Sequence, residues 1–411
     1  MTAFDRDFTM TIDGQGVAGA ARMPVLNPAT ETAVASAPLC SEAELDAAVA
    51  AARTAFPGWR ATPIETRRAA VRRIGEVIGA KMADFTRLFT LEQGRPLAKA
   101  SEELMGAAFW AGHVATQDIP VLVSEDTPER RAETRRVPIG VVGAIVPWNF
   151  PMLLGVWKIA GALLTGNTLV IKPSPYTPLT ILKLGELMRP HLPPGVLNVV
   201  SGGDALGPWM TAHPGIDKIS FTGSTATGKR VMASAAQSLK RITLELGGND
   251  AAIVLGDVDV AAVAGPLFWS AFVNSGQVCI ATKRLYVHDT VYDALAAELT
   301  AIAERVRMGD GLAPGSELGP IQNRPQYDRV RALIADARDA GLRFLTGGDV
   351  PDGKGYFIPV TLVDNPPEDS RVVAEEAFGP VLPLIRFTDV DDVIARANAS
   401  PYGLALSLIH I

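Results

Sequence analysis

The sequence predicts an α/β protein with two parallel-sheet domains and a small bridging β excursion. Short β-type runs alternate with helical segments across residues 137–221, and the same alternation resumes after Gly247. Elements that alternate in this way form parallel sheets with helices outside. A highly charged stretch, residues 129–136, lies just before the first alternating region. We expect the excursion there.

Length, charge and cysteine content limit the possible functions. A chain of 411 residues is longer than an ordinary domain with a single hydrophobic core, which favours two or more domains. Its formal net charge of −6 provides no basic footprint, so nucleic acid and anionic membrane are poor candidate partners. The two cysteines, Cys40 and Cys279, form no CxxC pair, and no secretory or transit signal is legible. The expected location is therefore the cytoplasm.

The most apolar stretch, residues 138–157, approaches the length of a membrane span. Pro147, Asn149 and Pro151 interrupt it where a spanning helix would need continuity. A buried strand that runs into a helix explains this stretch better.

Helical stretches precede the first sheet. Ser41 and Glu44 form a capping-box pattern, and helical spacing continues as far as Pro57 and Gly58, where we expect the helix to end. Apolar residues recur at threes and fours within residues 64–91, which predicts further helices that pack by one face.

The strand candidates follow the β-type runs. Those of the first domain are residues 141–146, 168–171, 197–200, 218–221 and 241–246, and those of the second are residues 251–255, 285–287 and 381–385. Within residues 241–246, Glu245 lies on the opposite face from Leu244 and Leu246. Gly247 and Gly248 then break the strand. Glu245 therefore ends a strand at a glycine turn.

Residues 223–229 form a glycine loop between a predicted strand and a predicted helix, where backbone N–H groups and the helix dipole can hold a phosphate. The loop nearly satisfies the pattern GxxxxGK[ST], but Arg230 occupies the position of the magnesium-binding hydroxyl. This departure argues against an NTPase. By itself the loop fits an ordinary strand-to-helix turn equally well.

Cys279 and Glu245 are candidates for covalent and acid–base chemistry. Small and polar residues precede Cys279 from Asn274 onward, which favours a loop that exposes the sulfur. A single cysteine can also be a small buried hydrophobe, and a single glutamate can be a surface carboxylate. Neither residue identifies a site alone.

Five short motifs follow one another along the chain, and the series is far more specific than any one motif. They are Pro147-Trp148-Asn149-Phe150-Pro151, the loop from Gly223 to Gly228, Glu245-Leu246-Gly247-Gly248-Asn249, Gly276-Gln277-Val278-Cys279 and Glu376-Ala377-Phe378-Gly379-Pro380. In this series the chain closely resembles the aldehyde dehydrogenase superfamily, from about Ser41 onward.

The resemblance implies four catalytic residues. Cys279 would add to an aldehyde as a thiolate, and Asn149 with the backbone N–H of Cys279 would form the oxyanion hole. Once hydride has left, Glu245 would take a proton from the water that hydrolyses the thioester, which needs a raised pKa in a partly dehydrated pocket. Lys158 would lie on the proton path, although a surface lysine is its plain alternative.

The resemblance also implies NAD or NADP as the cofactor. The cofactor-binding residues would be Trp148, Lys172, Ser174, Gly223, Ser224, Gly228, Glu376 and Phe378. Pro175 stands where members that prefer NAD often place a glutamate that repels a 2′-phosphate. Use of NADP therefore stays open.

The implied architecture is a Rossmann-like NAD(P)-binding domain of residues 1–118 and 139–246, a bridging and oligomerisation segment of residues 119–138, and a catalytic domain of residues 247–411. The substrate would be a small-molecule aldehyde, with Phe150, Trp157 and Phe272 suggesting an apolar entry tunnel. A homo-oligomer, dimer or tetramer, is expected for the complete protein. Family chains continue beyond the Tyr402-Gly403-Leu404 segment, so the C-terminus looks truncated.

Two alternatives stay open within this fold. A CoA-acylating aldehyde dehydrogenase resolves the thioester with CoA, although Glu245 argues against it because acylating relatives generally lack this base. A catalytically inactive fragment is the other. The five histidines are scattered without ligand spacing, so we expect no catalytic metal.

Overall fold

The computed structural model describes residues 4 and 6–410, and its chain divides into two compact units. The first unit comprises Met1–Val25, Ala33–Glu92 and Ala100–Glu245, and the second comprises Leu26–Thr32, Gln93–Lys99 and Leu246–Ile411. The chain passes from the first unit to the second after Glu245, next to the glycine turn at Gly247 and Gly248.

Two short segments differ from the predicted boundaries. Leu26–Thr32 and Gln93–Lys99 belong to the second unit, although residues 1–118 were expected to lie in the first domain. Hydrogen bonds explain the difference. The carbonyl of Pro28 accepts from the N–H of Tyr356 at 2.9 Å, and the N–H of Leu97 donates to the carbonyl of Gly311 at 3.1 Å.

The first unit is built on a seven-stranded sheet. Its strand order is β11 (Arg241–Glu245), β10 (Lys218–Thr222), β7 (Val141–Ile145), β8 (Thr168–Lys172), β9 (Leu197–Val199), β1 (Met10–Ile12) and β2 (Gln15–Val17). The strands from β11 to β9 are parallel, as predicted. β1 and β2, which carry no strong sequence signal, extend this sheet as antiparallel strands.

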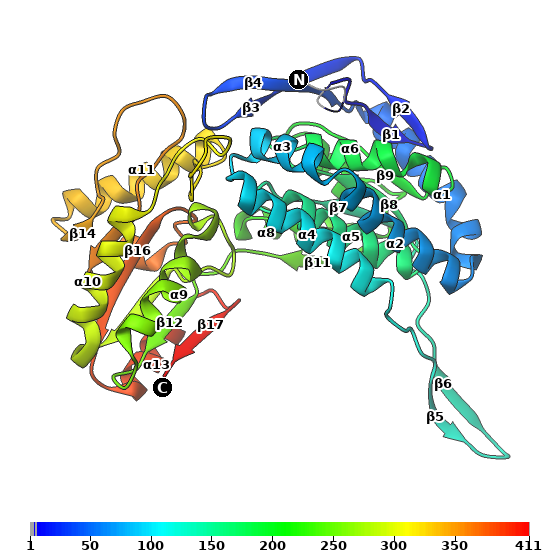
Figure 1. Cartoon of the computed structure of the whole chain (residues 1–411). Coiled ribbons are helices and arrows are strands. Elements are labelled where there is room, and N and C mark those ends of the chain that lie inside the picture. The colour runs from blue at the N-terminus through cyan, green and yellow to red at the C-terminus, as the bar shows by residue number, and fades with distance from the viewer. Residues whose placement is uncertain (1–3, 5, 411) are drawn as a thin grey trace. The chain divides into compact units, whose positions relative to one another are not determined.

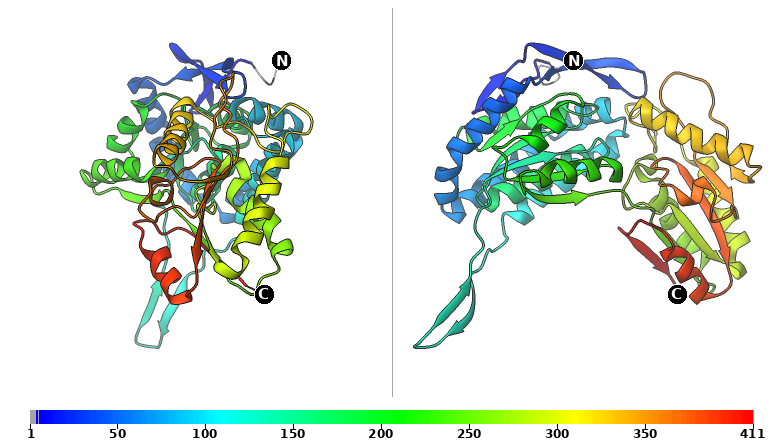
Figure 2. Two further views of the ribbon diagram at one scale, coloured as in Figure 1. Left: turned by 90° about the vertical axis from the view of Figure 1, so that its left-hand side faces the viewer. Right: turned by 180° about the vertical axis from the view of Figure 1, so that it is seen from behind.

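Helices cover both faces of this sheet (Figures 1 and 2). The helices α1 (Glu42–Ala61), α7 (Leu206–Ala212) and α8 (Thr225–Ala236) pack on one face, and α5 (Pro151–Leu164) and α6 (Leu179–Met188) pack on the other. α2 (Ile64–Ala80) packs on α5 and α6, and α3 (Met82–Gln93) and α4 (Leu97–Val114) follow it in the chain.

The arrangement of β7 and β10 makes their carboxyl ends the expected place for a bound ligand. These neighbours lie where the strand order reverses, because β8 and β9 continue to one side of β7 while β10 and β11 lie on the other. In open α/β sheets, ligands bind at such switch points. Residues 147–150 follow β7, and the glycine loop follows β10.

Helix α1 does not end at Pro57, contrary to the sequence prediction, but continues to Ala61. Pro57 removes one backbone donor, yet the following turn is held by tertiary contacts. Trp59 is only 3% exposed, and its Nε1–H donates to the carbonyl of Leu163 at 3.2 Å. The predicted capping box of Ser41 and Glu44 is confirmed at the other end of the helix.

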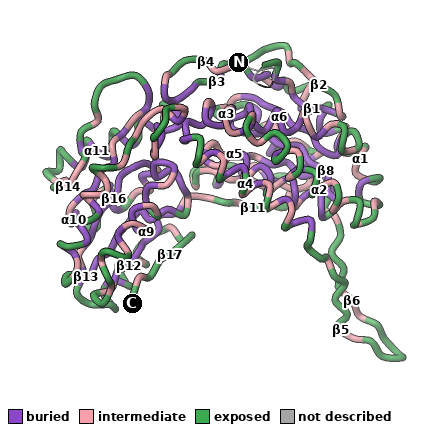
Figure 3. Tube along the Cα trace, in the orientation of Figure 1, coloured by how far each residue is buried: buried purple, intermediate pink, exposed green. Residues whose placement is uncertain are grey.

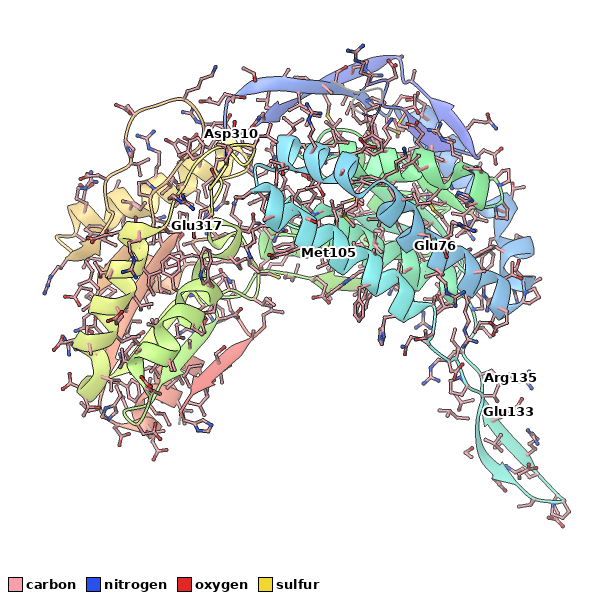
Figure 4. The ribbon with its side chains drawn as sticks, viewed as in Figure 1. Glu76, Met105, Glu133, Arg135, Asp310 and Glu317 are labelled. Atoms are coloured by element: carbon pink, nitrogen blue, oxygen red, sulfur yellow. The ribbon has the colours of Figure 1, made fainter. Side chains whose placement is uncertain are left out.

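The predicted β excursion is a two-stranded antiparallel ribbon of β5 (Leu122–Asp126) and β6 (Arg131–Thr134). Most of it is exposed (Figure 3). Arg130 pairs with Glu125 at 3.1 Å and Arg131 with Asp126 at 3.0 Å, while Glu133 and Arg135 lie next to each other (Figure 4). The arginines are therefore balanced by neighbouring carboxylates. A second two-stranded sheet pairs β3 (Ala21–Asn27) with β4 (Thr32–Leu39).

The second unit contains a six-stranded sheet. Its order is β14 (Phe344–Thr346), β15 (Thr361–Asp364), β16 (Val381–Phe387), β13 (Arg284–His288), β12 (Ala251–Val254) and β17 (Leu406–Ile409). All neighbours are parallel except β14 and β15. This result confirms the second predicted α/β domain.

Alternating side chains of this second sheet form two separate cores. Ala252 and Val254 pack with α9 (Val260–Phe272) and α10 (Asp289–Arg305). Ala251 and Ile253 face the opposite core, which contains residues of α11 (Arg324–Asp339), α12 (Arg371–Ala374) and α13 (Val390–Asn398). No helix in the described part of the chain is long and apolar enough to cross a membrane.

Candidate active site

The loop that carries Cys279 follows α9 and has an unusual backbone. Asn274, Ser275 and Gly276 have φ values of +53°, +54° and +75°, in the left-handed region that L-residues rarely adopt. A Cβ atom on Gly276 would collide with the carbonyl oxygen of Gly379, so only glycine fits here. Strained backbone that the surroundings hold in place is typical of functional loops.

Buried hydrogen bonds fix this loop. The side-chain amide of Gln277 donates to the carbonyl of Asn274 at 2.8 Å and accepts from the N–H of Gln322 at 2.9 Å. The hydroxyl of Ser275 donates to the carbonyl of Gly319 at 2.7 Å. Cys279 is half-buried and Ile280 after it is 60% exposed. The predicted exposed loop is thus a rigid loop with a partly accessible cysteine.

The two cysteines, both free, differ in their surroundings. Burial raises the pKa of the Cys40 thiol to about 12, and the charge of Glu44 raises it further. Burial also raises the pKa of Cys279, but the Lys283 ammonium and the backbone N–H groups of Ile280 and Cys279 act in the opposite direction. Cys279 therefore has groups that stabilise a thiolate, whereas Cys40 does not.

A buried lysine lies close to the Cys279 loop. The Nζ of Lys283 donates to the carbonyl of Cys279 at 2.7 Å and lies 3.7 Å from Oε1 of Glu376 and 3.8 Å from Oδ2 of Asp250. No sequence motif marks Lys283 or Asp250. The one sequence feature that could have pointed to Lys283 is its position immediately before a buried strand.

The glycine pair after Glu245 permits close approach of two segments in the second unit. A Cβ on Gly247 would collide with the carboxylate of Glu376, and a Cβ on Gly248 would lie 3.0 Å from the carbonyl oxygen of Cys279. The N–H of Gly248 donates to Oε1 of Glu376 at 3.2 Å. Cys279 and Glu376, predicted from separate motifs, are thus brought to the same backbone segment.

Phe378 lies on the same loop as Glu376 and has a φ of +50°. The side-chain amide of Gln326 donates to the carbonyls of Ala377 at 3.0 Å and Phe378 at 2.9 Å. This helix side chain therefore fixes the loop that presents Glu376 and Phe378.

In the first unit, Lys158 of α5 and Glu245 of β11 line one cavity of about 300 Å³. The Nζ of Lys158 donates to the hydroxyl of Ser220 at 3.0 Å. Burial lowers the pKa of Lys158 to about 8. The negative charge of Glu245 raises this pKa, and the positive charge of Lys218 lowers it further. Glu245 itself is exposed, which differs from the partly dehydrated pocket expected around it.

Asn149 lies between β7 and α5 and is 4% exposed. The first turn of α5 beside it is capped by a buried carboxylate, because Oε1 of Glu103 accepts from the N–H groups of Met152 at 3.0 Å and Leu153 at 3.1 Å. Trp148 is half-buried next to Asn149. Glu103 fixes the end of this segment, and no local sequence signal indicates it.

The glycine loop has the features of a phosphate site. Ser224 caps α8, since its hydroxyl oxygen accepts from the N–H of Thr227 at 3.2 Å. The N–H of Gly223 donates to the carbonyl of Glu245 at 3.0 Å, and Gly228 is buried in the first turns of the helix. The helix N-terminus thus directs its dipole towards the loop.

Lys172 and Ser174 follow β8 and are both buried. Burial lowers the pKa of Lys172 to about 8, while Asp204 raises it. In the described part of the chain, its ammonium donates one hydrogen bond, to the carbonyl of Pro173 at 3.4 Å. The hydroxyl of Ser174 accepts from the N–H of Tyr176 at 3.3 Å. Lys172 therefore retains donors for the hydroxyls of a ribose, so the residues present fit a dinucleotide.

One predicted side chain lies elsewhere. Phe272, expected in an apolar entry tunnel, is fully buried and packs against Phe268 at 4.8 Å between ring centroids. Phe272 does not line a tunnel because α9 turns this residue towards the core of the second unit. Within the described residues, no group of three or more His, Cys, Asp or Glu side chains forms a metal-ligand cluster.

Comparison with known proteins identifies a family. Residues 17–409 match the pattern described as "Aldehyde dehydrogenase family". A protein of Pseudomonas sp. named "Probable aldehyde dehydrogenase" is 45% identical over 396 residues, which cover 96% of this chain and 81% of that protein.

Solved structures give the same result. The NAD+ complex of the aldehyde dehydrogenase from Bacillus cereus is 34% identical with a TM-score of 0.96, covering 99% of this chain and 85% of that one. The E. coli NADP-dependent enzyme is 37% identical with a TM-score of 0.96, covering 99% of this chain and 86% of that one. The chain therefore belongs to the aldehyde dehydrogenase family and is an enzyme that oxidises an aldehyde with NAD or NADP.

Proposed function

We propose that Cys279 is the nucleophile of this oxidation. The observation that carries the proposal is its position, half-buried on a rigid loop whose own N–H groups and neighbouring Lys283 favour the thiolate. The thiolate adds to the carbonyl carbon of the aldehyde and forms a tetrahedral thiohemiacetal anion. The negative oxygen needs hydrogen-bond donors, and the side-chain amide of Asn149 and the backbone N–H of Cys279 are the donors in this proposal.

Eight residues hold the cofactor in this proposal: Trp148, Lys172, Ser174, Gly223, Ser224, Gly228, Glu376 and Phe378. The α8 N-terminus offers its dipole to the pyrophosphate, and the Lys172 ammonium offers donors to the adenosine ribose. When bound, the oxidised nicotinamide accepts the hydride. Pro175 provides no carboxylate against a 2′-phosphate, which keeps NADP as well as NAD among the cofactors to test.

Glu245 is the general base for hydrolysis of the Cys279 thioester. Its carboxylate takes one proton from the attacking water, the tetrahedral intermediate expels the thiolate, and the carboxylic acid leaves. Lys158 shares the cavity of Glu245 and has a pKa of about 8, so its neutral form can accept that proton onward near physiological pH. Lys158 is a relay in this scheme.

The same proposal gives each of the two units its own role. The first unit is the NAD(P)-binding domain and the second is the catalytic domain that carries Cys279. The ribbon of β5 and β6 is an oligomerisation segment, supported by the exposure of Val121, Leu122 and Val123 at 45%, 49% and 45%. We place the enzyme in the cytoplasm, because its sequence lacks paired cysteines.

The test is absorbance-monitored formation of NADH or NADPH from a panel of aldehydes, with and without CoA. Reduction without CoA that disappears in Cys279→Ala supports the hydrolytic mechanism. Cys40→Ala is the matched control, and it should retain activity because Cys40 lies outside the site. Turnover that requires CoA, or that persists in Cys279→Ala, contradicts the proposal.

A further inference from the structure

Lys283 is buried beneath the loop of the proposed nucleophile. Its side chain is 5% exposed, and its ammonium donates to the carbonyl of Cys279 at 2.7 Å and to that of Ala281 at 3.3 Å. The backbone from Cys279 to Ala281 therefore curves around one positive charge. Two of the three ammonium donors are occupied by this loop.

Two carboxylates stand on the other side of this ammonium. Oε1 of Glu376 lies 3.7 Å and Oδ2 of Asp250 lies 3.8 Å from Nζ, and these side chains are 15% and 5% exposed. Asp250 also accepts from the N–H of Ala405 at 3.0 Å through Oδ1. One lysine thus contacts the nucleophile loop and the carboxylate from the cofactor motif at the same time.

Stability alone explains this cluster poorly. Moving three charges out of water costs several kcal/mol for each ion, and well-packed apolar residues are commonly as stable or more stable than a buried ion pair. A neutral donor, such as a serine or an asparagine, could satisfy the carbonyl of Cys279 without that cost. The positive charge therefore needs another reason.

The charges around Cys279 identify that reason. Within the second unit, Lys283 lowers the pKa of the Cys279 thiol and Glu376 raises it. Arg329 lowers the pKa of Glu376, and Arg284 lowers the pKa of Asp250. Each carboxylate therefore has a second cation besides Lys283. Among the described residues, Lys283 is the cation that lowers the pKa of Cys279, of Glu376 and of Asp250 alike.

We propose that Lys283 is a positioning residue for the oxidation, in which its ammonium fixes the carbonyl of Cys279 and the carboxylate of Glu376 together. It holds the nucleophile loop in register with Glu376, one of the proposed cofactor-binding residues, and its charge favours the reactive thiolate. This inference rests on the proposed role of Cys279. In this proposal Lys283 acts through Cys279 and Glu376, not by contact with the aldehyde or the cofactor.

The test is the pH dependence of iodoacetamide alkylation at Cys279, measured by peptide mass without aldehyde or cofactor. Peptide mass separates Cys279 from the buried Cys40. In Lys283→Met, the alkylation midpoint should move up by about one pH unit, which slows alkylation about tenfold below the midpoint. Lys283→Arg keeps the charge and should stay near the wild type. Glu376→Gln removes the opposing carboxylate, so its midpoint should move down.

Opposite shifts in Lys283→Met and Glu376→Gln support the proposal. An unchanged midpoint in a folded Lys283→Met, checked by circular dichroism, overturns it. If Lys283→Met does not fold, Lys283→Gln decides, because this variant also removes the charge, and a midpoint equal to or below that of the wild type overturns the inference. Alkylation needs no turnover, so a Cys279→Ala variant that still oxidises aldehyde refutes the nucleophile assignment separately.

Discussion

At the scale of single residues, burial sets the chemistry of several amines and carboxylates. Lys158 lies in the cavity that Glu245 also lines, and burial is the largest influence on its pKa. The attraction of Glu245 opposes that effect, and the result is a pKa of about 8. Such an amine can change its protonation state near physiological pH, which is the property a proton relay needs.

The role of Lys158 predicts a feature of the pH profile. Only the neutral amine can accept a proton from Glu245, so kcat should rise as the pH passes through about 8. Lys158→Met should lack this rise, while Lys218→Met, which keeps Lys158, should retain it at a higher pH because one repelling cation is gone. Initial rates at saturating substrate between pH 6 and 10 provide the measurement. Identical profiles in wild type and Lys158→Met would rule out the relay.

Sequence motifs point to the proposed reactive residues but not to the side chains that hold them in place. Cys279 and Glu245 lie in recognisable motifs, and their sequence neighbours already indicate a loop and a strand end. Glu103 and Lys283 act through tertiary contacts instead. Glu103 caps the N–H groups of Met152 and Leu153, which lie 49 and 50 positions further along the chain. Lys283 meets Glu376 only because two loops converge. No local pattern encodes such distances.

At the scale of elements, the turn before Cys279 concentrates strain in one place. Gly276 combines a φ of +75° with a close approach to the carbonyl of Gly379. Any side chain here would have to displace the backbone of the loop that carries Phe378. The turn therefore sets both the direction of Cys279 and the position of its neighbour.

Gly276→Ala should lower kcat/KM by at least about 100-fold, because small displacements of a reacting group are costly in rate. Gly265→Ala is the matched control, since Gly265 lies in α9 with no heavy atom near its missing Cβ. That control should keep activity and gain up to about 1 kcal/mol of stability from helix propensity. Steady-state kinetics and thermal melting test both variants. Near-normal activity in Gly276→Ala would contradict a rigid loop.

Helix α6 is capped by the buried carboxylate of Glu92, which accepts from the N–H groups of Leu179 at 2.7 Å and Thr180 at 2.9 Å. Burial raises the pKa of Glu92 to about 7, Glu103 raises it further, and the hydrogen bonds from Thr180 and Leu179 oppose them. α6 follows the segment of Lys172 and Ser174. Glu92 therefore supports the proposed ribose site.

The raised pKa predicts a stability that falls with pH. The folded state holds the Glu92 proton more tightly than the unfolded state, so this contribution is complete below about pH 4.5 and is lost as the pH rises towards about 7. The loss amounts to about 3 kcal/mol at most, from about 1.4 kcal/mol per pKa unit. Urea unfolding at pH 5 and pH 8 should show a smaller pH difference in Glu92→Gln than in wild type. Equal differences would refute this linkage.

Elements were predictable where periodicity and local signals agree. The parallel strands and the capping box of α1 follow directly from the sequence. Pro57 misleads because the burial of Trp59 outweighs a local helix breaker. β1 and β2 have only three residues each, too few for a period of two to be recognised. β1 is fixed by its pairing with β9, and β2 by its pairing with β1.

At the scale of the whole molecule, the ribbon of β5 and β6 is largely exposed. It pairs with neither large sheet, and its ion pairs lie in solvent, where each contributes little. Exposed apolar side chains at Val121, Leu122 and Val123 are costly in a free monomer and useful in an interface.

If the ribbon is the oligomerisation segment proposed above, Leu122→Glu should reduce the mass of the particle in solution by placing a charge in the proposed interface. Leu239→Glu is the control, because Leu239 is 90% exposed and lies outside the ribbon. Light scattering with size-exclusion chromatography measures the mass of both variants, and circular dichroism checks folding. A wild type that is monomeric, or a Leu122→Glu variant with unchanged mass, would exclude the ribbon as the interface.

The most direct test of the hydrolytic mechanism is a stopped-flow measurement of NADH or NADPH formation by Glu245→Gln. Without the general base, acylation should still occur, giving a burst of about one equivalent of reduced cofactor per Cys279 and then very slow turnover. Intact mass should show the acyl adduct, and Cys279→Ala should show neither burst nor adduct. Steady turnover of Glu245→Gln at the wild-type rate, without a burst or an adduct, would contradict the central claim that Cys279 forms a thioester which Glu245 hydrolyses.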